Sequence, residues 1–171
     1  PGLGKTICAL TAFTEILDKK VKKLLIIAPL TIAKNVWINE ISKWSHTINL
    51  RISICCGDEE TRLAGLNNDA DIYVINQENV EWMYDKGFSK YGMIVVDESH
   101  EFKGSDSYRF KALKKFSSIY MVLLSGTPAP NGLIDFWSQQ YLIDKGKMFG
   151  DRITGFRKHY FRKKENGHGY E

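Results

Sequence analysis

The sequence has little cysteine, and its three cysteines form no pattern that would build a disulfide framework or a zinc site. Cys8 is isolated, Cys55 and Cys56 are adjacent, and no CxxC pair occurs. This usage is typical of a protein from a reducing intracellular compartment. We therefore expect no structural metal. Cys8 falls within a helical pattern and is expected to be a small core residue.

Long hydrophobic runs are also lacking. No apolar stretch approaches the roughly 20 residues that a helix needs to cross a bilayer, so no membrane partner is predicted. No signal-peptide pattern occurs either. The chain begins at Pro1, inside a glycine motif, and we expect it to be a piece of something larger.

The composition is that of an ordinary globular domain, with 43% hydrophobic and 26% charged residues in a chain of 171. The net charge of +4 is unevenly placed. Residues 1–144 carry 16 basic and 17 acidic side chains, whereas residues 145–171 carry eight and three. A basic tail is compatible with an anionic partner such as nucleic acid. On charge alone, a solvated surface helix is the better explanation.

Helical and strand patterns alternate along the whole chain. Continuous apolar runs predict strands buried on both faces, and one alternating segment predicts a further strand. The strands are expected over 24–28, 51–56, 71–75, 92–96 and 119–124, and the helices over 5–18, 32–46, 59–66, 77–85, 106–116, 133–143 and 151–161. This alternation predicts an α/β fold with a mostly parallel sheet and helices on both faces. Ligands bind such sheets at the carboxyl ends of the strands.

Gly2-Leu3-Gly4-Lys5-Thr6, at the start of the first predicted helix, matches the second half of a P-loop. Glycines let backbone N–H groups approach phosphate oxygens, and the helix N-terminus favours an anion. In a P-loop, Lys5 would reach the β- and γ-phosphates and Thr6 would bind Mg²⁺. The alternative is a simple glycine turn that precedes a helix.

Asp97-Glu98-Ser99-His100 follows the predicted strand 92–96 directly. An acidic residue at this place, together with a P-loop, is the Walker B arrangement, in which Asp97 would hold Mg²⁺. Glu98 would orient or deprotonate the attacking water. Two adjacent carboxylates at the end of a buried strand are costly unless a cation or other partners are present. The alternative is that Asp97 merely caps a helix.

Two further strand ends carry weaker signals. Ser125-Gly126-Thr127-Pro128 would contact the acidic pair, although glycine and proline also explain a plain turn. Ala28-Pro29-Leu30-Thr31 offers backbone and hydroxyl donors to a phosphodiester. Taken by composition, Thr31 is better explained as the cap of the next helix.

Taken in order, these motifs resemble the first RecA-like lobe of superfamily 2 helicases and, more narrowly, the Swi/Snf-type family of DNA-stimulated ATPases. The likeness runs from Gly2 to about Phe161, and phage and bacterial members look most similar. The matching residues are Pro29, Trp37, Glu40, Lys43 and Trp44, then Asp97, Glu98 and His100, and then Ser125 to Pro128, Asn131, Phe136 and Trp137.

The resemblance implies a three-layer RecA-like P-loop fold and ATP hydrolysis with Mg²⁺, coupled to translocation on double-stranded DNA without strand separation. Lys5, Asp97 and Glu98 would be catalytic, and Gly2, Leu3, Gly4, Lys5 and Thr6 would bind the nucleotide. His100, Ser125 and Thr127 would couple nucleotide state to DNA grip. DNA would contact Pro29, Leu30, Thr31, Asn76 and Gln77, although the sequence around Asn76 departs from the family's usual motif.

The resemblance also implies parts that this chain does not contain. An adenine-recognition segment, the first P-loop glycine and a second RecA-like lobe with an arginine finger would lie outside it. Residues 1–144 would then be the ATP-binding lobe and residues 145–171 a basic helical tail leading towards the second lobe. Arginine fingers contribute roughly 10³–10⁵ in rate, so the chain alone is expected to hydrolyse ATP barely.

Two other functions remain open at this stage. One is a strand-separating superfamily 2 helicase on DNA or RNA. The other is a nucleotide- or DNA-binding module without catalysis. An intracellular, cytoplasmic location in a bacterium or a phage-infected cell is expected.

Overall fold

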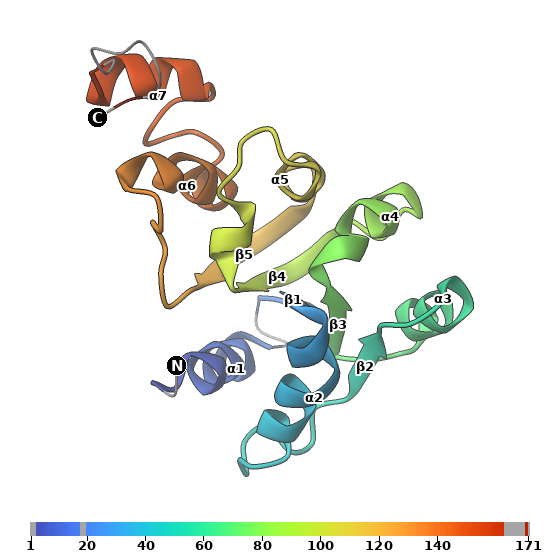
Figure 1. Cartoon of the computed structure of the whole chain (residues 1–171). Helices are drawn as coiled ribbons and strands as arrows, with labels where there is room; N and C mark the ends of the chain where they lie inside the picture. The colour runs from blue at the N-terminus through green and yellow to red at the C-terminus, as the bar shows by residue number, and fades with distance from the viewer. Residues whose placement is uncertain (1–2, 18–19, 163–169, 171) are drawn as a thin grey trace.

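The computed structural model describes residues 3–17, 20–162 and 170, and these form a parallel five-stranded sheet between two layers of helices (Figure 1). The strand order is β2-β3-β1-β4-β5, and each neighbouring pair is parallel. The strands are β1 (Leu24–Ala28), β2 (Ile52–Cys55), β3 (Ile72–Asn76), β4 (Lys90–Asp97) and β5 (Ser117–Leu124). The predicted α/β class and parallel sheet are confirmed.

Every predicted helix is present, with shifted ends. The helices are α1 (Lys5–Ile16), α2 (Leu30–Ile41), α3 (Glu59–Asn67), α4 (Val80–Asp85), α5 (Tyr108–Leu113), α6 (Phe136–Asp144) and α7 (Ile153–Tyr160). Short 3₁₀ turns over Gln77–Asn79, Ser99–Phe102 and Leu133–Asp135 precede α4, follow β4 and precede α6. Helix α2 ends before the predicted 46, because the Thr47 hydroxyl donates to the Ile41 carbonyl (2.7 Å) and closes a turn there.

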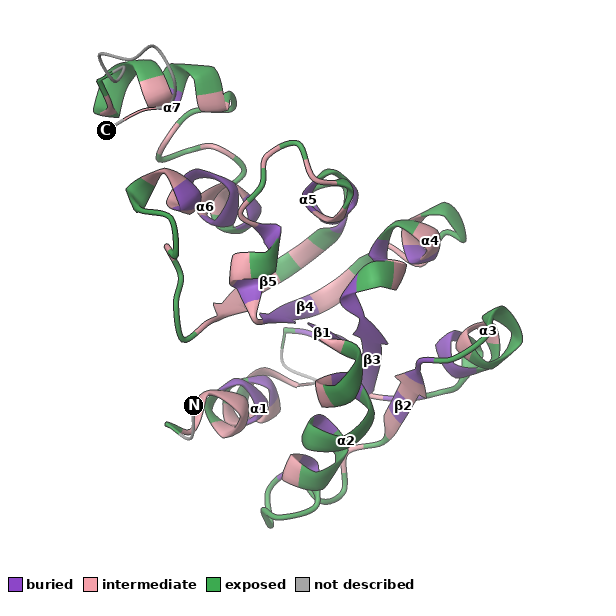
Figure 2. Ribbon diagram, viewed as in Figure 1, coloured by how far each residue is buried: buried purple, intermediate pink, exposed green. Residues whose placement is uncertain are grey.

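The two faces of the sheet bury alternate residues of the same strands. Leu24 and Ile26 of β1 pack with α1 and α2, whereas Leu25 and Ile27 pack in the cluster that includes residues of α4, α5 and α6. Figure 2 shows β3 as continuously buried, and all five residues of β1 are buried as well. Because both faces are covered, the strands read as continuous apolar runs rather than as alternating ones.

Tryptophans at helical spacing are expected to pack in the core. The four tryptophans of this chain divide between core and surface. Trp37 and Trp137 are buried. Trp82 is half-buried, with the Arg62 guanidinium 4.1 Å from its ring centre. Trp44 is 42% exposed, because α2 ends before it, and its Nε1 donates to Glu40 Oε1. The prediction was therefore wrong for Trp44. It was also wrong for Cys8, which is exposed on the outer side of α1.

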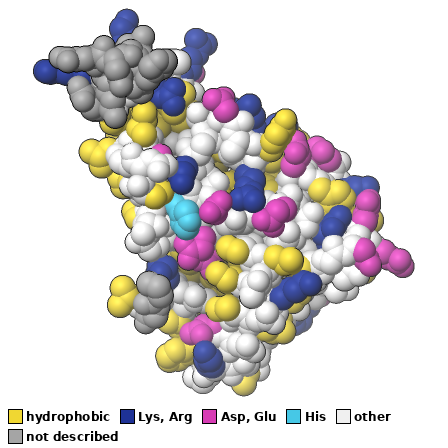
Figure 3. Space-filling view, in the orientation of Figure 1, with side chains coloured by type: hydrophobic (Ala, Val, Ile, Leu, Met, Phe, Trp, Pro, Cys, Tyr) yellow, Lys and Arg dark blue, Asp and Glu magenta, His cyan; other side chains and the backbone are white. Residues whose placement is uncertain are grey.

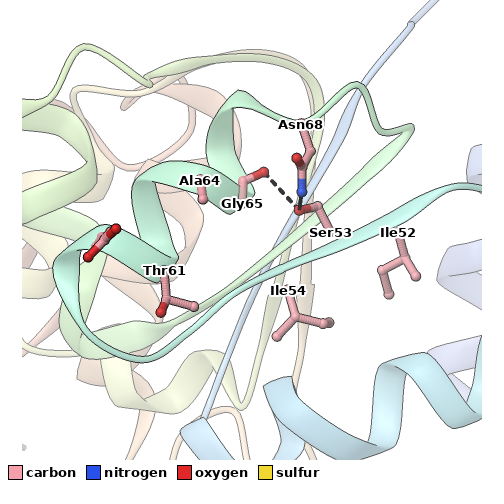
Figure 4. Close-up of a pocket in the computed structure, with 8 residues that line it drawn as sticks. Ile52, Ser53, Ile54, Thr61, Ala64, Gly65 and Asn68 are labelled. Atoms are coloured by element: carbon pink, nitrogen blue, oxygen red, sulfur yellow. Dashed lines mark hydrogen bonds between the residues drawn. The ribbon is translucent and has the colours of Figure 1, made fainter.

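At the β2 edge of the sheet, Gly65 lets α3 lie close to β2, since it has no side chain to separate the two elements. The Ser53 hydroxyl donates to the Gly65 carbonyl (2.8 Å), and the Asn68 amide donates to Ser53 Oγ (3.2 Å) (Figure 4). A hollow of about 510 Å³ opens between this strand and the helix. It contains none of the residues that the sequence marked as functional.

Gly92, in β4, lies against Val21 too closely for any side chain. A Cβ at this position would stand 2.4 Å from Val21 Cβ and 3.0 Å from its Cα. We expect Gly92→Ala to destabilise the 171-residue chain by about 1–3 kcal/mol, the usual cost of overpacking. Urea unfolding followed by circular dichroism measures this loss.

Gly155→Ala in α7 is the matched control, since a Cβ there meets nothing within 4 Å. Alanine favours a helix over glycine by about 1 kcal/mol, so this variant is expected to be neutral or more stable. Equal unfolding midpoints for the two variants would contradict the close approach of Gly92 to Val21.

The carboxyl-terminal part of the chain packs through aromatic side chains. Helix α7 lies beyond α6 at one end of the molecule (Figure 1). Phe156 is buried there between Phe149 and Tyr160, with ring centres 4.8 and 5.2 Å away. Residues 163–169 and 171 of the predicted basic tail lie outside the described residues. In the part of the chain that the structure describes, no helix is long and apolar enough to cross a membrane.

Candidate functional site

The start of α1 and the end of β4 meet at one cleft, although they are far apart in the sequence. This cleft has a volume of about 590 Å³, and the outer side of α2 forms another wall. Its lining residues are Leu3, Gly4, Lys5, Thr6, Ile7, Ile32, Val36, Glu40, Trp44, Asp97 and Glu98. The structure therefore places the predicted phosphate motif beside the predicted acidic pair. Gly2 lies outside the described residues.

The N-terminus of α1 has the local structure of an anion site. Gly4 is its N-cap and has φ 77°, a left-handed conformation that glycine adopts readily. No side chain caps the helix, and its first turn carries no acidic residue. Backbone N–H groups and the positive end of the helix dipole therefore face the cleft, and the first turn of α1 supplies no acidic side chain to offset them.

Three neighbours hold Asp97 in place. Trp37 Nε1 donates to its Oδ2 (3.3 Å), and the Glu98 backbone N–H donates to its Oδ1 (3.0 Å). The Gln77 side-chain amide donates to its carbonyl oxygen (2.8 Å). Burial raises the pKa of the Asp97 carboxyl, the Glu98 charge raises it further, and the two donors and Lys5 act in the opposite direction.

The residues at this cleft fit a magnesium ion. Mg²⁺ prefers oxygen ligands, and Asp97 and Thr6 supply a carboxylate and a hydroxyl to the same cleft. Burial raises the pKa of the Asp97 carboxyl more than its hydrogen-bond donors and Lys5 lower it, which leaves a deficit of positive charge around this carboxylate. A divalent cation would correct that deficit.

Glu98 has an unusual backbone conformation. Its φ of 49° and ψ of 51° are left-handed, a region that residues other than glycine rarely occupy. Such a conformation costs about 1–3 kcal/mol and persists only where neighbouring contacts impose it. Here the Glu98 N–H bonds to the Asp97 carboxylate, and Glu98 Oε2 lies 3.2 Å from His100 Nδ1.

The three residues predicted to couple nucleotide and DNA lie together. His100 Nδ1 is 3.2 Å from Ser125 Oγ, and the backbone N–H of Thr127 donates to the same oxygen (3.1 Å). The other ring nitrogen of His100 lies 3.5 Å from Glu101 Oε1. Arg109 bridges Glu101 and Glu78. Figure 3 shows charged side chains of both signs close together on one face of the molecule.

The residues predicted to touch DNA fall into two groups. Leu30 and Thr31 are exposed at the start of α2, and Pro29 is its N-cap without a side-chain hydrogen bond. Thr31 lies inside the first turn and does not cap the helix. By contrast, Asn76 and Gln77 are only 6% and 2% exposed, so neither offers surface to a DNA backbone in this structure. Their amides bond within the protein.

Sequence reasoning missed the residues that hold Asp97 and the turn after it in place. Trp37 was assigned to the core and Gln77 to DNA, yet both donate to Asp97. Gln139 of α6 received no role, and its side chain accepts a hydrogen bond from Ser99. No sequence signal identifies such partners, because they lie on other elements and only the fold makes them neighbours.

Known proteins resemble both the sequence and the fold. The SNF2-related domain family matches residues 1–166. Protein p41 of Acyrthosiphon pisum secondary endosymbiont phage 1 is 33% identical over 95% of this chain and 38% of its own length. The human DNA repair and recombination protein RAD54-like is 27% identical over 93% of this chain and 23% of its own length.

A solved structure is similar as well. The SWI2/SNF2 ATPase core of Sulfolobus solfataricus in complex with dsDNA has a TM-score of 0.79 and 28% sequence identity, and the match covers 92% of this chain and 32% of that one. The predicted RecA-like arrangement of sheet and helices is therefore confirmed. The chain spans well under half the length of each of these proteins.

Proposed function

The chain belongs to the SNF2-related domain family, and on that premise we propose that it is the ATP-binding lobe of a DNA-dependent ATPase that moves along double-stranded DNA. One observation carries the proposal. A single cleft holds Gly4, Lys5 and Thr6 at a helix N-terminus and Asp97 and Glu98 at the end of a buried strand. A phosphate cradle facing two carboxylates is the arrangement that nucleoside triphosphate hydrolysis requires.

In this proposal, the start of α1 binds the phosphates of ATP. Backbone N–H groups and the Lys5 ammonium offset the phosphate charge, and Thr6 and Asp97 would hold Mg²⁺. When bound, Mg²⁺ orients the phosphates and neutralises part of their charge. Trp37 and Gln77 keep Asp97 turned towards the cleft through their hydrogen bonds.

Glu98 is proposed to act on the attacking water. Its side chain lines the cleft beside Asp97, and its backbone has a left-handed conformation with φ 49°. A carboxylate held there accepts the water's hydrogen bond and then its proton, while the phosphoryl group leaves ADP. His100 contacts both Glu98 and Ser125, so it is placed to report the state of this carboxylate to the loop after β5.

Duplex DNA is proposed to contact the start of α2, near the carboxyl end of β1. Pro29, Leu30 and Thr31 begin this helix, its first turn carries no acidic residue, and Lys34 is exposed one turn further on. Helix N-termini and lysines are standard phosphate contacts that position a protein without reading sequence. Asn76 and Gln77 are left out of this interface because they are buried.

The lobe is proposed to work with a second one. Residues 145–171 would lead towards a second RecA-like lobe, which would supply the arginine worth roughly 10³–10⁵ in rate. By itself, the chain is then proposed to bind nucleotide with little turnover. We also infer that it acts inside a cell, where ATP and DNA are available together.

The test is ATP turnover by the complete natural protein that contains this chain, measured with duplex DNA, single-stranded DNA and RNA. Duplex DNA is expected to stimulate turnover most, without separation of a labelled duplex. A preference for RNA, or efficient strand separation, would contradict the translocase and favour a helicase. Nucleotide binding without turnover under any condition would indicate a binding module.

Lys34→Ala is expected to weaken duplex binding by the complete protein and to reduce its salt dependence. Loss of one phosphate contact lowers the slope of log K against log [salt] by about 0.9. Fluorescence anisotropy of labelled DNA at several salt concentrations measures this slope. Lys22→Ala is the matched control, since Lys22 is exposed at the opposite, amino end of β1. Equal slopes for both variants would exclude the start of α2 from the interface.

A further inference from the structure

A buried connection lies beneath the contact between His100 and Ser125. The Ser99 hydroxyl donates to Gln139 Oε1 at 2.9 Å. Ser99 is 1% exposed and Gln139 is 5% exposed, so this hydrogen bond is shielded from water. It joins the turn that carries Glu98 to helix α6.

The other end of the Gln139 side chain reaches the loop after β5. Its Nε2 donates to the Pro128 carbonyl and, at 3.3 Å, to the Asp135 carbonyl. These carbonyls only accept hydrogen bonds, so the amide nitrogen faces them and the amide oxygen faces Ser99. The Asp135 carboxylate accepts the Asn131 N–H (2.9 Å) and closes the same loop. One side chain thus bridges the two strand-end segments.

The position of this bridge bears directly on Glu98. Ser99 follows Glu98, which has a left-handed backbone conformation. Such a conformation persists only where contacts of the adjacent residues hold it. On one side, the Glu98 N–H is bonded to Asp97, and on the other, the Ser99 side chain is bonded to Gln139. A cavity of about 290 Å³ lies against the bridge, and its lining includes Ser99, Ser125, Pro128, Gln139 and Gln140. Without the bridge, this space would let the turn shift.

We propose that Gln139 is a positioning residue that holds the Glu98 turn in register with the Ser125–Pro128 loop. A movement of that loop would reach Glu98 through the Pro128–Gln139–Ser99 chain of hydrogen bonds. The inference rests on the proposed function, because it assigns Gln139 to the turnover that Glu98 is proposed to support. Gln139 itself does not line the cleft that holds Lys5, Asp97 and Glu98.

The test compares Gln139→Leu with wild type in the complete natural protein. Because misplacing a reacting group by about 1 Å costs up to about 100-fold in rate, kcat is expected to fall about 10-fold or more. The KM for ATP and the affinity for a fluorescent ATP analogue are expected to stay within about twofold, since the phosphate cradle is intact. A merely structural role would instead lower the melting temperature and leave kcat per folded molecule unchanged, and that result would overturn the inference.

Gln140→Leu is the matched control. Gln140 is the same residue type on the same helix, but its amide bonds to Asp144 within α6 (2.8 Å). It is expected to leave kcat within about twofold. An equal loss of kcat in both variants would show that α6 packing, and not the bridge, matters.

Ser99→Ala keeps the inference testable if Gln139→Leu folds poorly. It removes the other half of the same hydrogen bond and is expected to lower kcat in the same direction. If the two residues act through one bond, the double variant loses no more than the larger single loss. Additive losses would overturn the bridge. A wild-type protein without any ATP turnover would instead refute the proposed function, so the two failures are distinguishable.

Discussion

Glu98→Gln is expected to lower ATP turnover by the complete natural protein about 10²–10⁴-fold, the usual worth of a general base. The amide keeps the size and polarity of the side chain but cannot take a proton from water. ATP affinity is expected to change by less than about twofold, because Lys5 and the start of α1 are untouched. Single-turnover hydrolysis and analogue binding, measured on the same preparation, separate the two effects.

The matched control for this variant is Glu101→Gln. Glu101 lies in the 3₁₀ turn that directly follows Glu98 and contacts His100 and Arg109, but it does not line the cleft. Its replacement is expected to leave turnover within about threefold, since it breaks only exposed ion pairs. Retained turnover in Glu98→Gln would mean that another group serves the attacking water.

Trp37→Ala is expected to destabilise the chain by about 3–5 kcal/mol, the usual loss for a buried tryptophan. Trp37 is fully buried in α2 and is among the largest side chains of the core. For a domain of this size, each kcal/mol lowers the melting temperature by roughly 2–4 °C, so calorimetry should show a fall of about 6–20 °C. Trp44→Phe is the control, because Trp44 is 42% exposed and its change is expected to cost at most about 0.5 kcal/mol.

Trp37→Phe separates packing from the hydrogen bond to Asp97. The ring stays in the core, while the Nε1 donor that faces Asp97 Oδ2 is lost. This donor lowers the pKa of the Asp97 carboxyl, which burial has raised, so its loss raises that pKa further. The Asp97 carboxylate is then protonated at a higher pH than in wild type. Because turnover needs this carboxylate, the acid limb of the kcat/KM profile moves to higher pH. An unshifted limb would show that the indole N–H does not act on Asp97.

Local patterns predicted the helices and strands of this chain well. The apolar runs at 24–28 and 92–96 became β1 and most of β4, because strands buried on both faces need apolar side chains at every position. Helix ends were less predictable. Thr31 looked like a cap, but Pro29 occupies that place, and Trp44 falls beyond the end of its helix.

The sequence predicted the motifs of the candidate site, but it did not predict the residues that support them. Gly4, Lys5 and Thr6, and likewise Asp97 and Glu98, follow spacing rules that a linear sequence displays. Their partners do not follow such rules. In the sequence, Gln77 is simply a polar residue that follows a strand. Its amide reaches the Asp97 carbonyl because β3 and β4 lie on either side of β1 in the sheet.

By itself, the sequence determined the α/β class and the order of the elements, and it pointed to the residues proposed to bind phosphate and activate water, since periodicity and strand-end motifs are local properties. Only the tertiary structure decided which of these residues are held rigidly. Trp37 and Gln77 position Asp97, Gln139 joins the Glu98 turn to the loop after β5, and Asn76 is withdrawn from the surface. The physical reason is that hydrogen bonds and burial between distant segments depend on how the sheet and its helices pack, and no spacing in the sequence encodes that packing.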